Sequence, residues 1–182
     1  MAASHSDIRD LLVIELQDLL SGEKQQAKVL AKLARKASDP ELKEAFETHL
    51  EETEQQIERL KQAFELLGEK AKARTCKAVK GLGEEAMELM DEDMSPELMD
   101  AALICAAQKA EHYEIASYGS VCSYAEALGE DEVADLMNQT LEEEKATDEI
   151  LNDLALGHIN RRAMGQETRN VRNTGRESRR AF

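Results

Sequence analysis

The sequence has no tryptophan, only two prolines and 3% aromatic residues among its 182 residues. The large aromatic side chains that favour strands are therefore scarce. Alanine, leucine, glutamate, lysine and glutamine dominate instead, and these residues have high helix propensity. A chain of this length most often forms one domain with a sizeable core. The composition thus predicts a single all-α domain.

The three cysteines, Cys76, Cys105 and Cys122, form no C-x-x-C pair, and an odd number argues against a disulfide framework. We expect Cys105 and Cys122 to be buried free thiols. No apolar run approaches the roughly 18 residues that a membrane-spanning helix needs, so the sequence predicts no membrane segment. Residues 1–10 lack the basic and then apolar layout of a signal peptide. These features predict a cytoplasmic protein.

The formal net charge of −15 is unevenly distributed. Residues 161–182 contain seven arginines and two glutamates, so the first 160 residues carry a charge of −20. An acidic body discourages general binding to nucleic acid and attracts cations. We predict a bundle domain over residues 1–158 and a basic, disordered tail over residues 159–182. The tail is either a solvated extension or a weak anchor to DNA or another polyanion.

Apolar residues recur every three or four positions in four long segments, which predicts helices over residues 7–37, 40–67, 96–128 and 131–156. A polar residue followed by proline starts the second and third of these helices, and a glycine follows the end of the second, third and fourth. The connection over residues 69–94 is irregular, apart from a short helix predicted at residues 84–92.

Tight turns within each helix pair and one long connection between the pairs are typical of a ferritin-like four-helix bundle with a single crossover. The short helix at 84–92 would lie in that crossover. An up-down bundle with an irregular middle is the alternative. A storage cage is less consistent with the sequence, because residues 158–182 carry no apolar stripe for a fifth helix.

Polar residues interrupt the apolar stripe near the midpoint of every predicted long helix. A helix midpoint in a bundle lies far from water, where an unpaired carboxylate is very costly. Carboxylates from facing helices at one level form metal sites in bundle cores. With an imidazole among them, they suit iron or manganese, with zinc as another choice. We therefore predict a site for two metal ions, with an open position for dioxygen or peroxide, whose ligands are Glu23, His49, Glu52, Glu111, Glu114 and Glu144.

A metal-free interpretation stays open at this stage. Inward glutamates can pair with lysine, arginine or glutamine, and His49 taken alone can be a hydrogen-bonded core histidine. The chain would then be a non-catalytic helical bundle, acting as a dimer or an adaptor. We expect a homodimer in either case, because the alanine-rich third long helix offers a face for a second copy.

Five segments resemble the ferritin-like proteins of the YciF/YciE type, which are small bacterial stress-associated proteins. These segments are residues 21–25 (SGEKQ), 49–53 (HLEET), 56–60 (QIERL), 106–119 (AAQKAEHYEIASYG) and 142–148 (EEEKATD). The resemblance spans residues 7–156 and implies a four-helix bundle associated with stress.

A more remote similarity to rubrerythrin implies a diiron site with glutamate ligands from four helices, at Glu23, Glu52, Glu111, Glu114 and Glu144. The chain departs from that pattern on two helices, where His49-x-x-Glu52 replaces E-x-x-H and Thr147 replaces a histidine after Glu144. It also lacks a rubredoxin-type cysteine pair. The resemblance implies the fold and the metal site rather than a particular reaction. Our first hypothesis for the function is a dinuclear-metal stress protein that oxidises Fe(II) or consumes peroxide, and enzymatic activity stays open.

Overall fold

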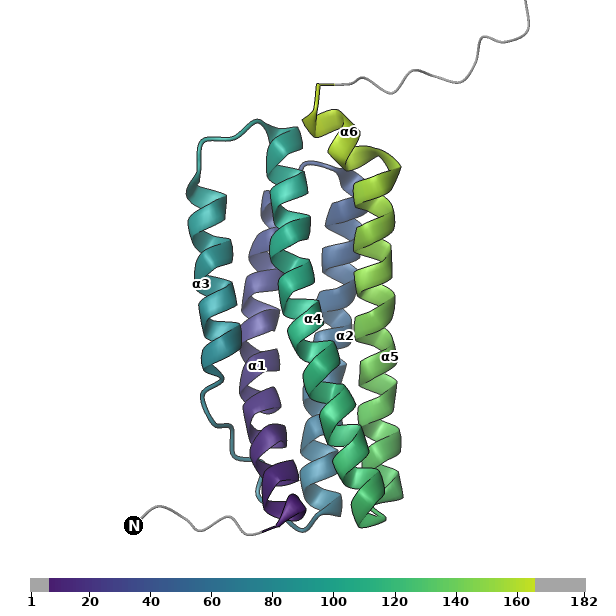
Figure 1. Cartoon of the computed structure of the whole chain (residues 1–182). Coiled ribbons are helices and arrows are strands. Elements are labelled where there is room, and N and C mark those ends of the chain that lie inside the picture. The colour runs from purple at the N-terminus through teal and green to yellow at the C-terminus, as the bar shows by residue number, and fades with distance from the viewer. Residues whose placement is uncertain (1–6, 166–182) are drawn as a thin grey trace, which may run out of the picture.

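A computed structural model describes residues 7–165, which contain helices and no strand. Figure 1 shows the elements in order. They are α1 (Ile8–Lys36), α2 (Pro40–Leu66), α3 (Lys77–Asp91), α4 (Pro96–Leu128), α5 (Asp131–Leu154), the π-helical turn η1 (Ala155–Ile159) and α6 (Asn160–Ala163). Within the described residues, no helix is both long and apolar enough to cross a membrane.

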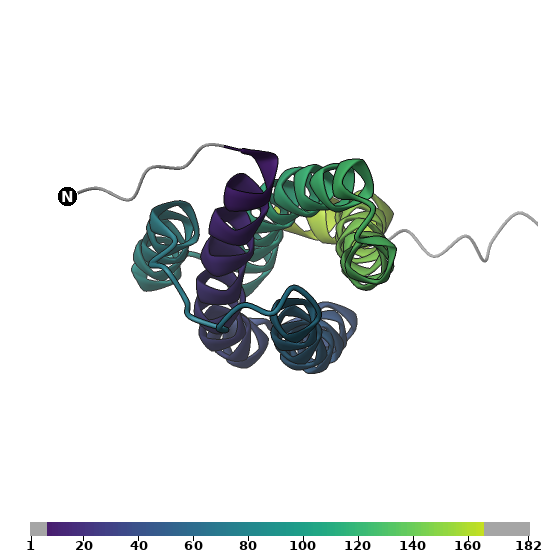
Figure 2. The ribbon, with the colours of Figure 1, turned by 90° about the horizontal axis from the view of Figure 1, so that it is seen from below.

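The four long helices pack as two hairpins, α1 with α2 and α4 with α5 (Figures 1 and 2). The crossover carries α3, which lies outside the bundle against α1 and α4. Because α3 runs back along the bundle, α4 starts at the same end as α2 and runs parallel to it (Figure 1). The predicted ferritin-like four-helix bundle with one long crossover is confirmed, and the up-down alternative is wrong.

Local sequence explains where the long helices begin and end. The Asp39 carboxylate accepts hydrogen bonds from the backbone amides of Glu41 and Leu42, which caps α2 directly before Pro40. The Ser95 hydroxyl caps α4 by accepting from the Leu98 amide. Gly129 ends α4 with a φ of 71°, a left-handed conformation that glycine adopts without strain.

The core consists of two apolar clusters stacked along the bundle. One cluster contains Leu12 and Leu16 of α1, Phe64 of α2 and Met137 of α5, together with buried residues of α4. The other lies beyond it and includes Phe46. Between the clusters each long helix contributes buried polar residues instead of apolar ones. The fold therefore has a polar layer at its waist, as the interrupted apolar stripes predicted.

The crossover helix is longer than predicted, because α3 begins at Lys77 and not at residue 84. The thiol of Cys76 caps it by accepting from the Val79 amide. Val79 is buried against Gly22 of α1, where an added Cβ would lie 3.3 Å from Val79 Cγ2. The glycine lets α3 approach α1 closely. This contact between distant segments is not visible in the basic, glycine-containing sequence of residues 69–83.

The cysteines are free, and their burial was predicted only in part. Cys122 is buried as expected, whereas Cys105 is exposed, so its predicted burial was wrong. Cys105 lies on the side of α4 that faces away from the two apolar clusters. An alanine-rich helix offers no clear apolar stripe, which explains why its outward face was misassigned.

The helical part of the chain extends beyond the predicted boundary at residue 158. Helix α5 continues through η1 and α6 up to Ala163, and Ile159 is buried in the second apolar cluster. His158 Nε2 and Arg162 Nη1 lie 2.8 Å and 2.6 Å from Asp39 Oδ2. Residues 159–163 therefore belong to the bundle and not to the basic tail. The rest of the predicted tail, from residue 166 onward, lies outside the described residues.

Asp100 holds the α1–α2 turn, and its loss should destabilise the fold. Its buried carboxylate accepts hydrogen bonds from the Ser38 amide (2.8 Å), the Ser38 hydroxyl (2.6 Å) and the Asp39 amide (3.0 Å). We expect Asp100→Ala to lower the free energy of unfolding by about 2–4 kcal/mol, because it leaves three donors without an acceptor. Urea unfolding measures this loss. The exposed-site variant Asp93→Ala is the control, and an equally small loss in both would contradict the assignment.

Candidate metal centre

Five of the six predicted ligands meet in the polar layer between the two apolar clusters. Each long helix supplies at least one of them, and none has more than 2% of its surface exposed: Glu23, His49, Glu111, Glu114 and Glu144. Such burial is rare for glutamate unless it is paired or binds a metal. The sixth, Glu52, is different, because its side chain is 35% exposed.

Three of these residues form a compact group of donor atoms from α2, α4 and α5. His49 Nε2 lies 3.3 Å from Glu111 Oε2 and 3.4 Å from Glu144 Oε2. One donor atom from each residue lies within 4.8 Å of the other two, which is compatible with a single bound cation. One imidazole with two carboxylates is a donor set that suits iron, manganese or zinc.

The other half of the layer is built from Glu23 of α1 and Glu114 of α4. The Tyr118 hydroxyl, one turn after Glu114, donates a 2.5 Å hydrogen bond to Glu23 Oε1. Burial, with the nearby Glu144 carboxylate as the next cause, raises the pKa of Glu23 to about 8. Burial also raises the pKa of Glu114 well above its usual value, with the Glu23 carboxylate as the next cause.

The layer contains more buried acceptors than the described residues can satisfy. Both carboxylate oxygens of Glu111, Glu114 and Glu144 and Oε2 of Glu23 are buried without a hydrogen-bond partner among residues 7–165. Each buried acceptor left unpaired costs about 1–3 kcal/mol. His49 is close enough for ion pairs but is not aligned for hydrogen bonds to Glu111 or Glu144. One imidazolium cannot neutralise four carboxylates, whereas two divalent cations can, so the residues fit a dinuclear metal centre.

Proton affinities in the layer reflect this shortage of positive charge. Burial alone would lower the pKa of His49, but the carboxylates of Glu111, Glu144 and Glu52 outweigh it and raise the pKa. Burial raises the pKa of Glu111 to about 8 despite the opposing effect of His49. For Glu144, the contacts with His49 outweigh burial and lower the pKa. The metal-free layer therefore favours the protonated forms of His49, Glu23, Glu111 and Glu114 and the ionised form of Glu144.

Glu52 and Thr147 contact the other side of the His49 ring. His49 Nδ1 lies 3.2 Å from Glu52 Oε2 and 3.1 Å from Thr147 Oγ1. Thr147, which replaces the histidine of the rubrerythrin pattern, thus meets the imidazole. A carboxylate on the second ring nitrogen fixes the orientation of a metal-binding histidine. The structure places Glu52 beside His49 and outside the buried group, and its role as a direct ligand stays a prediction.

One ion pair beside the layer was missed in the sequence. Arg59 of α2 is 8% exposed, and its guanidinium donates to Thr140 Oγ1 (2.6 Å) and to both carboxylate oxygens of Glu143 (2.6 Å each). The Gln56 amide also donates to Glu143 (3.2 Å). Nothing in the local sequence distinguishes Glu143 from the solvated glutamates around it. The only signal was that Arg59 follows Gln56 by three residues on the inward side of α2.

The fold and the polar layer together define a ferritin-like four-helix bundle with a buried carboxylate and histidine centre. The chain belongs to the family described as Domain of unknown function (DUF892), which matches residues 7–164.

Relatives of known structure share this architecture. Protein YciF of Escherichia coli strain K12 is 50% identical over 157 residues, which is 86% of this chain and 95% of that protein. The crystal structure of YciF, described as a stress protein, superimposes with a TM-score of 0.82 over 86% of this chain and 99% of that one. YcfI from Rhodopseudomonas palustris, described as a putative structural protein, is 39% identical with a TM-score of 0.81 over 84% and 97% of the two chains. The predicted resemblance to YciF-type proteins is confirmed.

Proposed function

We propose that the chain is a dinuclear-metal stress-response protein, with iron as its preferred metal and manganese or zinc as alternatives, and that it oxidises Fe(II) with peroxide or dioxygen. The observation that carries the proposal is the set of carboxylate oxygens at the waist of the bundle that are buried and have no hydrogen-bond partner within residues 7–165. Its similarity to a stress protein supports the physiological setting. The cytoplasmic location and the homodimer stay predictions.

The residues divide naturally between two ions. His49, Glu111 and Glu144 would hold one, because their donor atoms already lie together. Glu23 and Glu114 would hold the second from the opposite side of the layer. Bound Fe(II) would supply one electron per ion, so that two ions and two protons reduce one hydrogen peroxide to two waters while two Fe(III) ions form.

The chain's own groups prepare this chemistry. The Tyr118 hydroxyl fixes Glu23, and Glu52 and Thr147 fix the His49 ring. Cation binding would displace protons from the carboxyls whose pKa is raised, so the layer would release protons as it takes up metal. The apolar clusters on both sides exclude bulk water from the layer.

A non-catalytic, metal-free bundle is the second candidate function. The description of YcfI as a putative structural protein and the ion pairs of His49 favour it. In that case the chain would act in the stress response as a dimer or an adaptor, and metals would neither bind nor react.

Iron oxidation separates the two functions. Protein loaded anaerobically with Fe(II) and mixed with hydrogen peroxide should consume one peroxide per two Fe(II), faster than iron in buffer, as followed by near-ultraviolet absorbance. We expect the Glu111→Ala and Glu144→Ala variants to fall to the buffer rate, because each removes a ligand. Glu142→Ala, an exposed neighbour on α5, is the control and should retain the rate. Equal rates in all four proteins would reject the proposed reaction.

A further inference from the structure

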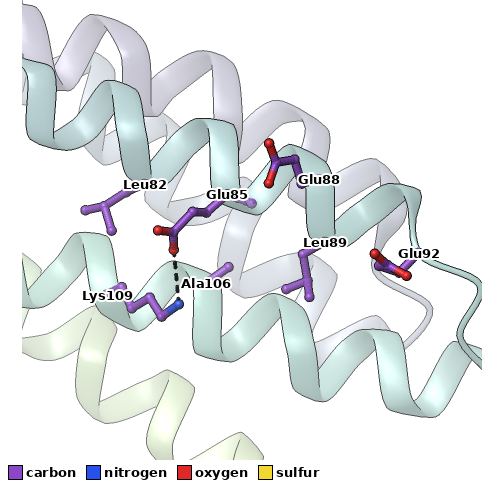
Figure 3. Close-up of a pocket in the computed structure, with 8 residues that line it drawn as sticks. Leu82, Glu85, Glu88, Leu89, Glu92, Ala106 and Lys109 are labelled. Carbon is purple, nitrogen blue, oxygen red and sulfur yellow. Dashed lines mark hydrogen bonds and ion pairs between the residues drawn. The ribbon is translucent and has the colours of Figure 1, made fainter.

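A groove with an apolar floor and an acidic rim runs between α3 and α4, outside the metal centre (Figure 3). Its volume is about 270 Å³. Leu82, Ala86 and Leu89 of α3 and Ala106 of α4 supply its apolar surface. The remaining lining residues are charged, namely Glu85, Glu88, Glu92 and Lys109.

The negative charge of this groove is only partly balanced. Lys109 Nζ lies 3.3 Å from Glu85 Oε2. Within residues 7–165, no lysine, arginine or histidine forms an ion pair with Glu88 or Glu92. The three glutamates follow one another at intervals of three and four residues, so they form a row along one side of the helix. The groove therefore offers a line of carboxylates above an apolar floor.

We propose that this groove is the docking site of the chain's own arginine-rich C-terminal segment, residues 166–182. That segment carries five arginines and two glutamates, so its charge is opposite to that of the groove. Arg169, Arg172 and Arg176 recur along the segment, so it offers several guanidinium groups to a row of three carboxylates. Arginine suits such a site, because its methylene stem packs on apolar surface while its guanidinium pairs with a carboxylate.

The position of the described chain end favours docking within one molecule. Helix α6 lies on the first turns of α4, and the chain leaves the described part at Gly165 at the same end of the bundle as the C-terminal end of α3 (Figure 1). The 15 residues of α3 span about 22 Å at ~1.5 Å per residue. An extended segment of 17 residues (166–182) can reach roughly 55 Å. The segment can therefore follow the whole groove.

An acidic row on the outer face of α2 provides a matched comparison. Glu47, Glu51 and Glu54 are exposed and are also spaced by four and three residues. Lys43 Nζ already lies 3.8 Å from Glu47 Oε1. Single exposed ion pairs contribute little, so a charge row alone is a weak site. The α3–α4 groove adds apolar contact to the row, which is why we assign the segment to α3.

A spin label on the C-terminal segment tests the proposal in the full-length chain. The label is attached at Ser178→Cys in a Cys105→Ala background, and backbone amide signals are recorded by NMR. We expect broadening of signals from residues 82–92 and no broadening of signals from residues 47–58. The triple variant Glu85→Lys, Glu88→Lys, Glu92→Lys should lose the broadening. The control triple variant Glu47→Lys, Glu51→Lys, Glu54→Lys should keep the broadening. In the labelled chain and in this control variant, ~1 M salt should weaken the broadening.

Four results would overturn the proposal. The first is an absence of broadening on α3 at low salt. The second is equal loss of broadening in both triple variants, which would indicate unspecific attraction to an acidic body. The third is broadening that occurs only when a spin-labelled copy is mixed with a second copy that carries the isotope label and no spin label. That result would make the contact intermolecular. The fourth combines two observations. The α3 signals show no broadening, and retention on DNA is abolished in the triple variant Arg169→Glu, Arg172→Glu, Arg176→Glu. The segment would then bind a polyanion instead.

Discussion

Replacing Glu114 with leucine is expected to stabilise the metal-free protein by about 1–4 kcal/mol while it removes metal binding at the Glu23 side of the layer. Glu114 is 1% exposed and neither of its oxygens has a hydrogen-bond partner among the described residues. Replacing a buried, poorly satisfied ionisable group with an apolar residue of similar volume is often stabilising by this amount. A residue that destabilises its own fold in this way is expected at a binding site and not in a structural core.

Urea unfolding of chelator-treated wild-type protein and Glu114→Leu measures the difference, and metal titration of the same samples measures the loss of binding. Glu54→Leu, at an exposed position of α2, is the control and should change stability by less than about 0.5 kcal/mol. If Glu114→Leu destabilises the metal-free protein, then the carboxyl makes a favourable structural contact, and our interpretation of the layer is wrong.

The stability of the metal-free protein is expected to fall as the pH rises from about 5 to about 8.5. The pKa values of Glu23 and Glu111 are raised to about 8 in the folded state from 4.5. Between those values the folded chain binds more protons than the unfolded chain, so the free energy of unfolding decreases with pH. The raised pKa of His49 acts in the same direction, because its favourable charge is lost as the pH rises. The total change should be at least about 3 kcal/mol.

Thermal melting at a series of pH values checks this expectation. The metal-loaded protein should show the opposite trend over the same range, because metal binding requires deprotonated carboxylates and strengthens as the pH rises. The two curves should diverge most near pH 8. Parallel curves with and without chelator would mean that the carboxylates of the layer do not bind the metal.

The features that could be predicted from the sequence depend on local patterns. Apolar spacing and caps such as Ser95 act within one or two helical turns, so the four long helices and their turns were predicted closely. Glu23 and Glu144 were placed at the same height in the bundle because each lies near the midpoint of its predicted helix. Both are buried in the predicted polar layer. Antiparallel hairpins align midpoints whatever the details of packing, which is why this inference succeeded.

The features that were missed depend on contacts between distant residues. Arg59 and Glu143 are separated by 84 positions, and nothing near either one indicates the pair. The early start of α3 depends on Val79 meeting Gly22 across the bundle. The orientation of Glu52 depends on which ring nitrogen of His49 faces outward. Periodicity shows which face of a helix is buried, but it does not show which side chain meets which.

Anaerobic metal titration tests the central claim, that bound cations neutralise the buried carboxylates, more directly than any other measurement. Protein stripped with chelator and titrated with Fe(II) should bind two ions per chain and release protons, and its melting temperature should rise as binding saturates. His49→Ala and Glu144→Ala should each reduce the stoichiometry. Binding of less than one ion per chain, with the same melting temperature before and after chelation, would contradict the claim and leave a metal-free scaffold.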